Sequence, residues 1–124
     1  MTNLVAERST AIEGVDKAKL VARLADDAKA ADIVVLDVRG MSNITDYFVI
    51  MTGTSRNHLR ALGKRLRDGM LEAGARAERV DGEKATNWVV FDYGNVVVHA
   101  MLEETRVFYD LERLWGDARR VSWN

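Results

Sequence analysis

The chain has 124 residues, of which 48% are hydrophobic and 30% are charged, a balance that fits one soluble folded domain. A formal net charge of −1 at pH 7 excludes nucleic-acid binding through overall charge, so any site for a polyanion must be a local patch. The absence of cysteine excludes disulfides and thiolate zinc sites, and no apolar run approaches the roughly 20 residues of a membrane span, so we expect a cytoplasmic protein.

The first half of the chain contains a lead-in, a helix and two strands. Residues 1–13 show little periodicity and predict a flexible N-terminal lead-in. Apolar residues at helical spacing then predict a first helix over residues 15–31. Short β-branched runs predict a buried strand over residues 33–38 and a second strand over residues 47–51. Ser55 is placed to cap the next helix.

A second helix and three strands follow. The apolar face of the helix ends at Gly74, a residue suited to the C-terminal end of a helix. Residues 75–80 predict a weak third strand, and residues 82–86 predict a loop. Residues 88–93 and 96–102 predict two strong strands, because both are rich in β-branched and aromatic side chains.

The C-terminal part predicts a short helix or a pair of turns over residues 106–115. Phe108, Leu111 and Trp115 fall at i, i+3 and i+7, which places them on one side of such a helix. A polar tail is predicted over residues 117–124.

Nothing in the composition divides the chain, since it has no proline, no repeat and no linker-like stretch. We therefore expect one domain over residues 14–116. The predicted order αββαβββα indicates an α+β fold in which the helices pack on one face of a mixed sheet.

Gly94 and Asn95 predict a two-residue turn between the last two strands, with glycine supplying the positive φ of a type II′ turn. That turn pairs Trp88 with Met101 and separates two faces of the hairpin. The first face is apolar and must look into the core: Val89, Phe91, Tyr93, Val96, Val98, Ala100 and Leu102. The second face mixes large apolar and polar side chains: Trp88, Val90, Asp92, Val97, His99, Met101 and Glu103.

The mixed face of the hairpin is typical of a protein interface. Trp88 and Met101 would supply desolvated contact area, and the polar groups of the face would fix the orientation of the partner. The alternative is that residues 105–115, or a second copy of the protein, cover this face, which would make Trp88 a core residue.

Charge is distributed unevenly along the chain. Residues 92–117 hold six acidic and two basic groups, a net charge of −4, which favours a basic partner unless this is an ordinary solvated face. A stripe of basic residues on the second helix, Arg56, Arg60, Lys64 and Arg67, either touches phosphate or is a solvated helix face.

We find no pattern that predicts a catalytic, cofactor or metal site. The turn before Ser55 has no Gly-Lys-Ser/Thr and no Asp-x-Asp pair after it, so it is interpreted as a helix cap. His99 and Asp92 lie diagonally on the hairpin with no serine or threonine beside them. His58 and His99 are too far apart in the predicted fold to make a metal site.

Two linked motifs carry a resemblance to a known family. Residues 88–99 read Trp-Val-Val-Phe-Asp-Tyr-Gly-Asn-Val-Val-Val-His, and residues 109–115 read Tyr-Asp-Leu-Glu-Arg-Leu-Trp. They resemble the ribosomal silencing factor (RsfS, or Iojap-like) family, and the similarity extends over about residues 15–116. Two departures are Asn95, where the family has Asp, and Phe108, where it has Tyr.

The resemblance implies a nucleotidyltransferase-like fold without its catalytic residues. It further implies binding to ribosomal protein uL14 on the large ribosomal subunit, which would block joining of the small subunit and repress translation under nutrient limitation. The implied partner-binding residues, with Met101 and Glu103 added from the hairpin face, are Trp88, Asp92, Tyr93, His99, Met101, Glu103, Tyr109, Asp110, Leu111, Glu112 and Trp115.

Two other functions are compatible with the sequence. A homodimeric ribosome-assembly or interaction factor without a silencing role would pair the hairpin face with itself. An enzyme of nucleotidyl-transfer ancestry would bind nucleotide with magnesium.

Overall fold

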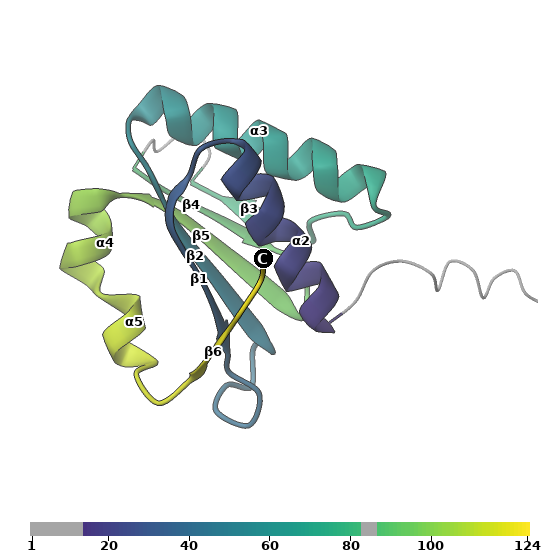
Figure 1. The fold of residues 1–124 in the computed structure, drawn as a ribbon, viewed down its shortest axis with the longest axis vertical. Coiled ribbons are helices and arrows are strands. Elements are labelled where there is room, and N and C mark those ends of the chain that lie inside the picture. The colour runs from purple at the N-terminus through teal and green to yellow at the C-terminus, as the bar shows by residue number, and fades with distance from the viewer. Residues whose placement is uncertain (1–13, 83–86) are drawn as a thin grey trace, which may run out of the picture.

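The β-branched runs of the sequence form a six-stranded mixed sheet in the computed structural model, which describes residues 14–82 and 87–124 (Figure 1). The strands are β1 Ala31–Asp37, β2 Tyr47–Gly53, β3 Arg79–Asp81, β4 Trp88–Asp92, β5 Val96–Leu102 and β6 Arg119–Val121. Their order in the sheet is β3-β4-β5-β2-β1-β6, with β2 and β5 parallel and the other neighbours antiparallel. The predicted α+β fold is confirmed, whereas the predicted lead-in and residues 83–86 of the predicted loop lie outside the described residues.

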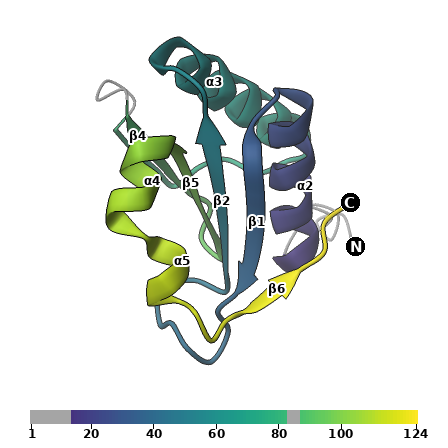
Figure 2. The ribbon, with the colours of Figure 1, turned by 60° about the vertical axis from the view of Figure 1, so that its left-hand side comes forward.

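Helices cover both faces of the sheet, not one face as the sequence predicted. The helices are α2 Gly14–Asp27, α3 Arg56–Glu72, α4 Glu103–Tyr109 and α5 Leu111–Leu114. Figure 2 shows α4 and α5 on the opposite side of the sheet from α2 and α3. The faces of a strand alternate, and β5 has apolar side chains on both of them, so this strand is buried from two sides.

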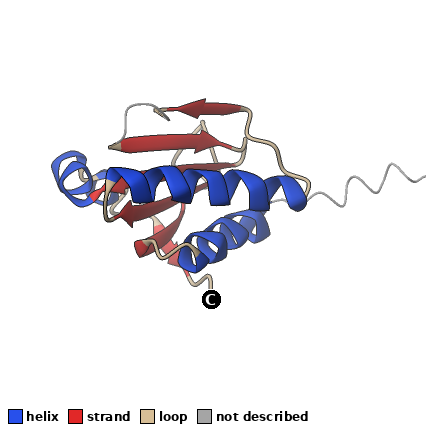
Figure 3. Cartoon of the chain, turned by 90° about the horizontal axis from the view of Figure 1, so that it is seen from above, coloured by secondary structure: helices blue, strands red, loops and turns tan. Residues whose placement is uncertain are grey.

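The main core lies between the sheet and the two long helices, which lie side by side along one face (Figure 3). Leu59, Leu62 and Leu66 of α3 meet Phe91 of β4 there, and all four side chains are 1% exposed or less. Close approach is needed at Gly63, because a Cβ at this position would lie 3.3 Å from Cζ of Phe91. The first hairpin face is therefore a core face, as predicted.

Local signals set the helix ends. The Oγ of Ser55 accepts a hydrogen bond from the backbone N–H of His58 (3.0 Å), which confirms the predicted cap. Gly74 has a φ of +86° just beyond the end of α3, as its placement predicted. The first helix ends at Asp27 rather than residue 31, because Lys29 turns into the left-handed region with a φ of +69°.

The predicted hairpin register is confirmed, with Trp88 opposite Met101 and Asp92 opposite Val97. Gly94 has a φ of +85°. An Oδ1 of Asp92 accepts a hydrogen bond from the N–H of Gly94 (2.8 Å) and so holds the turn. Lys17 of α2 donates to the carbonyl oxygen of Tyr93 (3.0 Å), which ties the turn to the helix layer.

Several strand boundaries differ from the prediction: β1 covers residues 31–37 rather than 33–38, β2 extends to residue 53 rather than 51, and β4 ends at residue 92 rather than 93. The third strand begins at Arg79 rather than residue 75, because the N–H of Ala75 is used to close α3 by a hydrogen bond to the carbonyl of Met70 (2.8 Å). The predicted polar tail includes β6, which pairs with β1, so the folded region extends past residue 116. Trp123 follows β6 and packs against the main core.

Candidate docking surface

A break at Asp110 divides the C-terminal helical region into α4 and α5. Asp110 has a φ of 48° and a ψ of 54°, so one left-handed residue ends the first helix and begins the second. The predicted single face is therefore wrong. Leu111 and Trp115 are half-buried against the sheet, but Phe108, on the other side of the break, is 78% exposed.

A buried arginine fixes the two short helices to each other and to the sheet. The Nε and Nη2 of Arg106 donate to the two carboxylate oxygens of Glu112 at 3.0 and 2.9 Å, and its Nη1 donates to the Oγ1 of Thr52 at 2.8 Å. These hydrogen bonds lower the pKa of Glu112, which keeps the carboxylate ionised. Glu112, expected to bind a partner, is thus engaged within the chain.

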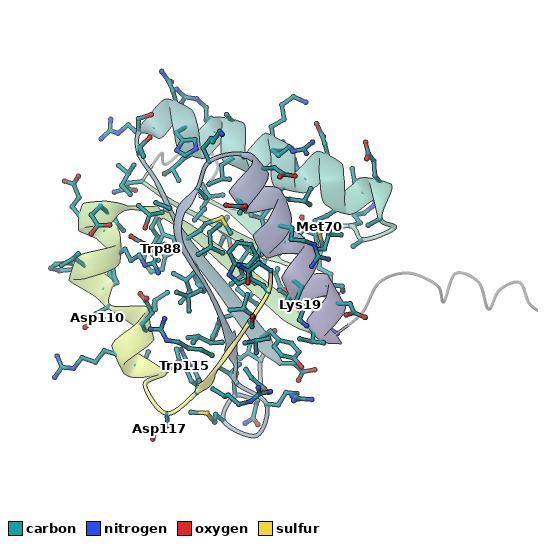
Figure 4. The ribbon with its side chains drawn as sticks, in the orientation of Figure 1. Lys19, Met70, Trp88, Asp110, Trp115 and Asp117 are labelled. Carbon is teal, nitrogen blue, oxygen red and sulfur yellow. The ribbon has the colours of Figure 1, made fainter. Side chains whose placement is uncertain are left out.

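Aromatic side chains form a layer between the sheet and these helices. The Nε1–H of Trp88 donates to Nδ1 of His99 (3.1 Å), and the rings of Trp88 and Tyr109 lie 4.6 Å apart. Trp115 packs against Phe48 of β2 with a centroid distance of 5.3 Å. Figure 4 shows Trp88, Asp110 and Trp115 together on this side of the molecule, away from Met70 on α3.

Burial in this layer lowers the pKa of His99 to about 4, so the ring is neutral at pH 7. Because Nδ1 accepts the hydrogen bond from Trp88, the proton of the neutral ring lies on Nε2. His99 also lines an apolar pocket of about 280 Å³ with Ile44, Phe48, Val97, Leu111 and Trp115. The lining of this pocket is almost wholly apolar, so it can receive an apolar side chain.

The outer side of α4 and α5 exposes several large apolar side chains to solvent, and we name it the α4–α5 surface. Its members are Val107, Phe108, Tyr109 and Leu114. Phe108 is 78% exposed and Leu114 is 72% exposed, and Ile44 beside the apolar pocket is also 78% exposed. A group of exposed apolar side chains next to an apolar pocket is characteristic of a protein-binding surface.

Acidic groups border the α4–α5 surface. Glu103, Glu104 and Asp110 are exposed there. Glu103 and Asp110 also line a cleft of about 580 Å³ between α4 and β1, with Asp32 opposite them. Besides Arg106, which is paired with Glu112, the cleft contains one other cation, Arg120. The surroundings of the surface are therefore net acidic and favour a basic partner.

The structure bears on the predicted role of four residues, which it places wholly or partly inside the fold. Met101 is fully buried under α4 and α5 and cannot anchor a partner from this position. Tyr93 is 3% exposed and belongs to the opposite, main core. Trp88 is half-buried beneath Tyr109, so the terminal helices partly cover the hairpin face, which was the alternative reading of the sequence. Asp92 is half-buried, and its carboxylate accepts a hydrogen bond within the hairpin turn.

Sequence reasoning missed the most exposed members of the α4–α5 surface, Val107, Phe108 and Leu114. The sequence did contain an indication of this surface, because six of the nine residues from 107 to 115 are apolar. A short helix that packs on a sheet can bury only one side, so this many apolar residues must leave some of them exposed. Counting them would have indicated an outer apolar surface.

No group of three or more potential metal ligands occurs within residues 14–82 and 87–124. In the same residues, no helix is long and apolar enough to cross a membrane. The turn before α3 is occupied by structural hydrogen bonds, since the backbone N–H of Thr54 donates to Nδ1 of His58 (2.9 Å).

Comparison with known proteins gives a consistent family match. The family model described as "Ribosomal silencing factor during starvation" matches residues 10–124. The ribosomal silencing factor of Bacillus subtilis is 39% identical over 100 residues, which cover 81% of this chain and 85% of the relative.

Two further relatives extend the comparison. The mouse protein named "Mitochondrial assembly of ribosomal large subunit protein 1" is 40% identical over 89 residues, covering 69% of this chain and 39% of that protein. A crystal structure of a Chromobacterium violaceum protein superposes with a TM-score of 0.82 at 32% identity, covering 90% of this chain and 92% of that one.

Proposed function

Because the chain belongs to the ribosomal silencing factor family, we propose that it binds the large ribosomal subunit through ribosomal protein uL14 and thereby blocks joining of the small subunit. In this proposal the chain represses translation simply by occupying the face of the large subunit that the small subunit would contact. It does so in the cytoplasm, under nutrient limitation. The chain performs no catalysis and needs no cofactor or metal.

The observation that carries the proposal is the α4–α5 surface. Phe108 and Leu114 are largely exposed to solvent, and burying them against a partner would release water from both surfaces. The half-buried residues Trp88 and Trp115 lie behind the surface: Trp88 contacts its exposed member Tyr109, and Trp115 packs on Phe48 of the sheet. The motif residues therefore act partly by contact and partly by supporting the exposed side chains.

Charge favours a protein partner over RNA at this surface. Exposed Glu103, Glu104 and Asp110 would repel phosphate and attract lysine or arginine side chains. A basic ribosomal protein with an apolar patch fits both properties. The acidic residues then set the orientation of binding, and the apolar residues supply most of the affinity.

An assembly factor is the second candidate function. The mouse relative is named for assembly of the ribosomal large subunit, and the same docking surface would serve a protein that binds an immature subunit. Silencing requires that the bound chain block the joining of mature subunits, whereas an assembly role does not. Binding to mature subunits that leaves subunit joining unchanged would favour the assembly role.

The docking surface can be tested with the double variant Phe108→Ala, Leu114→Ala, which truncates exposed side chains and leaves the core intact. We expect its binding to purified large subunits to weaken by about 2 kcal/mol or more, the loss typical of truncated interface anchors. Cosedimentation of the full chain with subunits over a range of concentrations measures this loss.

Leu71→Ala provides a matched control, because Leu71 is a 46% exposed apolar residue on α3, across the sheet from the α4–α5 surface. It should bind like the wild-type chain. Equal binding by the double variant, the control and the wild-type chain would show that partners dock elsewhere.

A further inference from the structure

The first two-thirds of α3 carry a concentration of positive charge. Residues 56–67 contain five basic residues and no acidic one, although the whole chain has a net charge of −1. The helix has no acidic residue in its first turn, where a carboxylate would be stabilised by the helix dipole. Its positive end and its cations therefore add to one local positive potential.

Four of these cations, Arg56, Arg60, Lys64 and Arg67, follow one side of the helix. Arg56, Arg60 and Lys64 follow at steps of four residues, which advance about 6 Å along the helix, and Arg67 follows Lys64 after three residues, or about 4.5 Å. Arg56, Arg60 and Lys64 are exposed, and the side chain of Lys64 is 74% exposed. The stripe thus presents a row of positive charge to solvent along one side of the helix.

A groove runs beside this stripe, between α3 and β4. It has a volume of about 310 Å³ and is lined by Arg60, Lys64 and Arg67 on the helix side, with Val89 and Phe91 of β4 below. Gly63 leaves the groove open above Phe91, because it has no side chain to fill this space. The groove therefore combines a cationic rim with an apolar floor.

We infer that the α3 stripe and its groove bind the sugar-phosphate backbone of RNA. Phe91 is fully buried, so its ring cannot stack on a base, and no other aromatic side chain lines the groove within the described residues. Binding through phosphate contacts alone is independent of base sequence. We name RNA rather than another polyanion because the inference rests on the proposed ribosomal function. The positions of the cations do not depend on that proposal.

The local partners of the cations are compatible with this role. Lys64 pairs with Asp68 (2.7 Å) and Arg60 donates to Oδ1 of Asn57 (2.6 Å), both at exposed positions. Exposed pairs of this kind contribute little free energy and exchange readily for a phosphate contact. The stripe lies across the sheet from the α4–α5 surface, so RNA bound here leaves the protein-docking surface free (Figure 2).

The test measures binding of the full chain to a fluorescently labelled RNA duplex of mixed sequence, and to a second duplex of unrelated sequence. We expect similar affinities for both, and the variant Arg60→Gln, Lys64→Gln should bind at least about tenfold more weakly, with the salt dependence of log K reduced by about 2. Thermal unfolding checks that the variant folds.

The control variant Arg113→Gln, Arg120→Gln removes the same charge from α5 and β6, across the sheet, and should bind RNA like the wild-type chain. No measurable RNA binding, equal weakening by both variants, or binding to anionic phosphatidylserine vesicles in place of RNA would overturn the inference. Large-subunit binding by the Phe108→Ala, Leu114→Ala variant is measured separately, so failure of the RNA site and failure of the proposed function are distinguishable.

Discussion

Tyr93 belongs to the family motif but lies inside the fold rather than at a surface. Its ring stacks near Phe91 in the main core, and its hydroxyl group has no hydrogen-bond partner within the residues that the structure describes. Burial raises the pKa of this hydroxyl to about 12, so it stays protonated. A buried hydroxyl without a partner lowers the stability of the folded state.

Tyr93→Phe should therefore raise the free energy of unfolding by up to about 1 kcal/mol, because it removes an unsatisfied polar group and keeps the ring. Large-subunit binding should be unchanged, since Tyr93 is remote from solvent. Urea unfolding and cosedimentation measure the two effects. A clear loss of subunit binding without loss of stability would show that Tyr93 contributes to docking.

His99 makes stability depend on pH. The unfolded chain takes up a proton near the ordinary pKa of about 6.5, whereas folded His99 stays neutral down to about 4, so stability is lost as the pH falls through this window. Between pH 7 and about pH 5 the loss should be about 2 kcal/mol. His99→Gln, which retains an acceptor for Trp88, should lack this dependence in urea unfolding. An identical pH dependence in both proteins would exclude His99 as the cause.

Asn95 shows why one departure from the family motif is tolerated. The Nζ of Lys17 donates to Oδ1 of Asn95 at 3.1 Å, so the amide oxygen accepts the bond that a carboxylate would accept. The motif could be read from the sequence. The reason for its tolerance could not, because Lys17 lies 78 residues away and meets the turn only in the folded chain.

At the scale of elements, the hairpin could be predicted and the terminal helices could not. A two-residue turn fixes the β4–β5 register, so alternation along the strands was sufficient to assign both faces. The break between α4 and α5 depends on the left-handed conformation of Asp110. Helical spacing alone carries no information about such a break, and every residue after it changes face.

Tertiary pairing explains the other differences. β6 is a three-residue strand containing two arginines, and it is recognisable only because β1 offers it an open edge. The burial of Met101 likewise depends on where α4 and α5 return to the sheet. The sequence motifs indicated the region of the proposed docking surface, but the exposed side chains within it emerged only from the packing of these helices.

Arg106→Met tests whether one ion pair holds the C-terminal helices in place. Removing the guanidinium leaves Glu112 and Thr52 without their partner at a mostly buried site, so we expect the free energy of unfolding to fall by about 2 kcal/mol. Amide hydrogen exchange in α4 and α5 should also become faster. Arg113→Met, at an exposed position on α5, is the matched control. Unchanged exchange in the Arg106 variant would mean that apolar packing alone fixes these helices.

The molecule carries two different surfaces on opposite sides of its sheet. The α4–α5 side is apolar and acidic, and the α3 side carries a basic stripe. In the proposed function, this uneven distribution of charge would help to orient the chain during its approach to a ribosomal surface of mixed protein and RNA. A docked chain would keep this orientation because the sheet holds the two surfaces in a fixed relation.

Subunit joining tests the central claim most directly. Purified small and large subunits are mixed with the full chain under conditions that favour joining, and the products are separated on a sucrose gradient. We predict that the wild-type chain leaves free subunits with the protein on the large one, and that Phe108→Ala, Leu114→Ala restores joined ribosomes. Joined ribosomes that form normally while the wild-type chain remains bound to the large subunit would contradict the proposed silencing function.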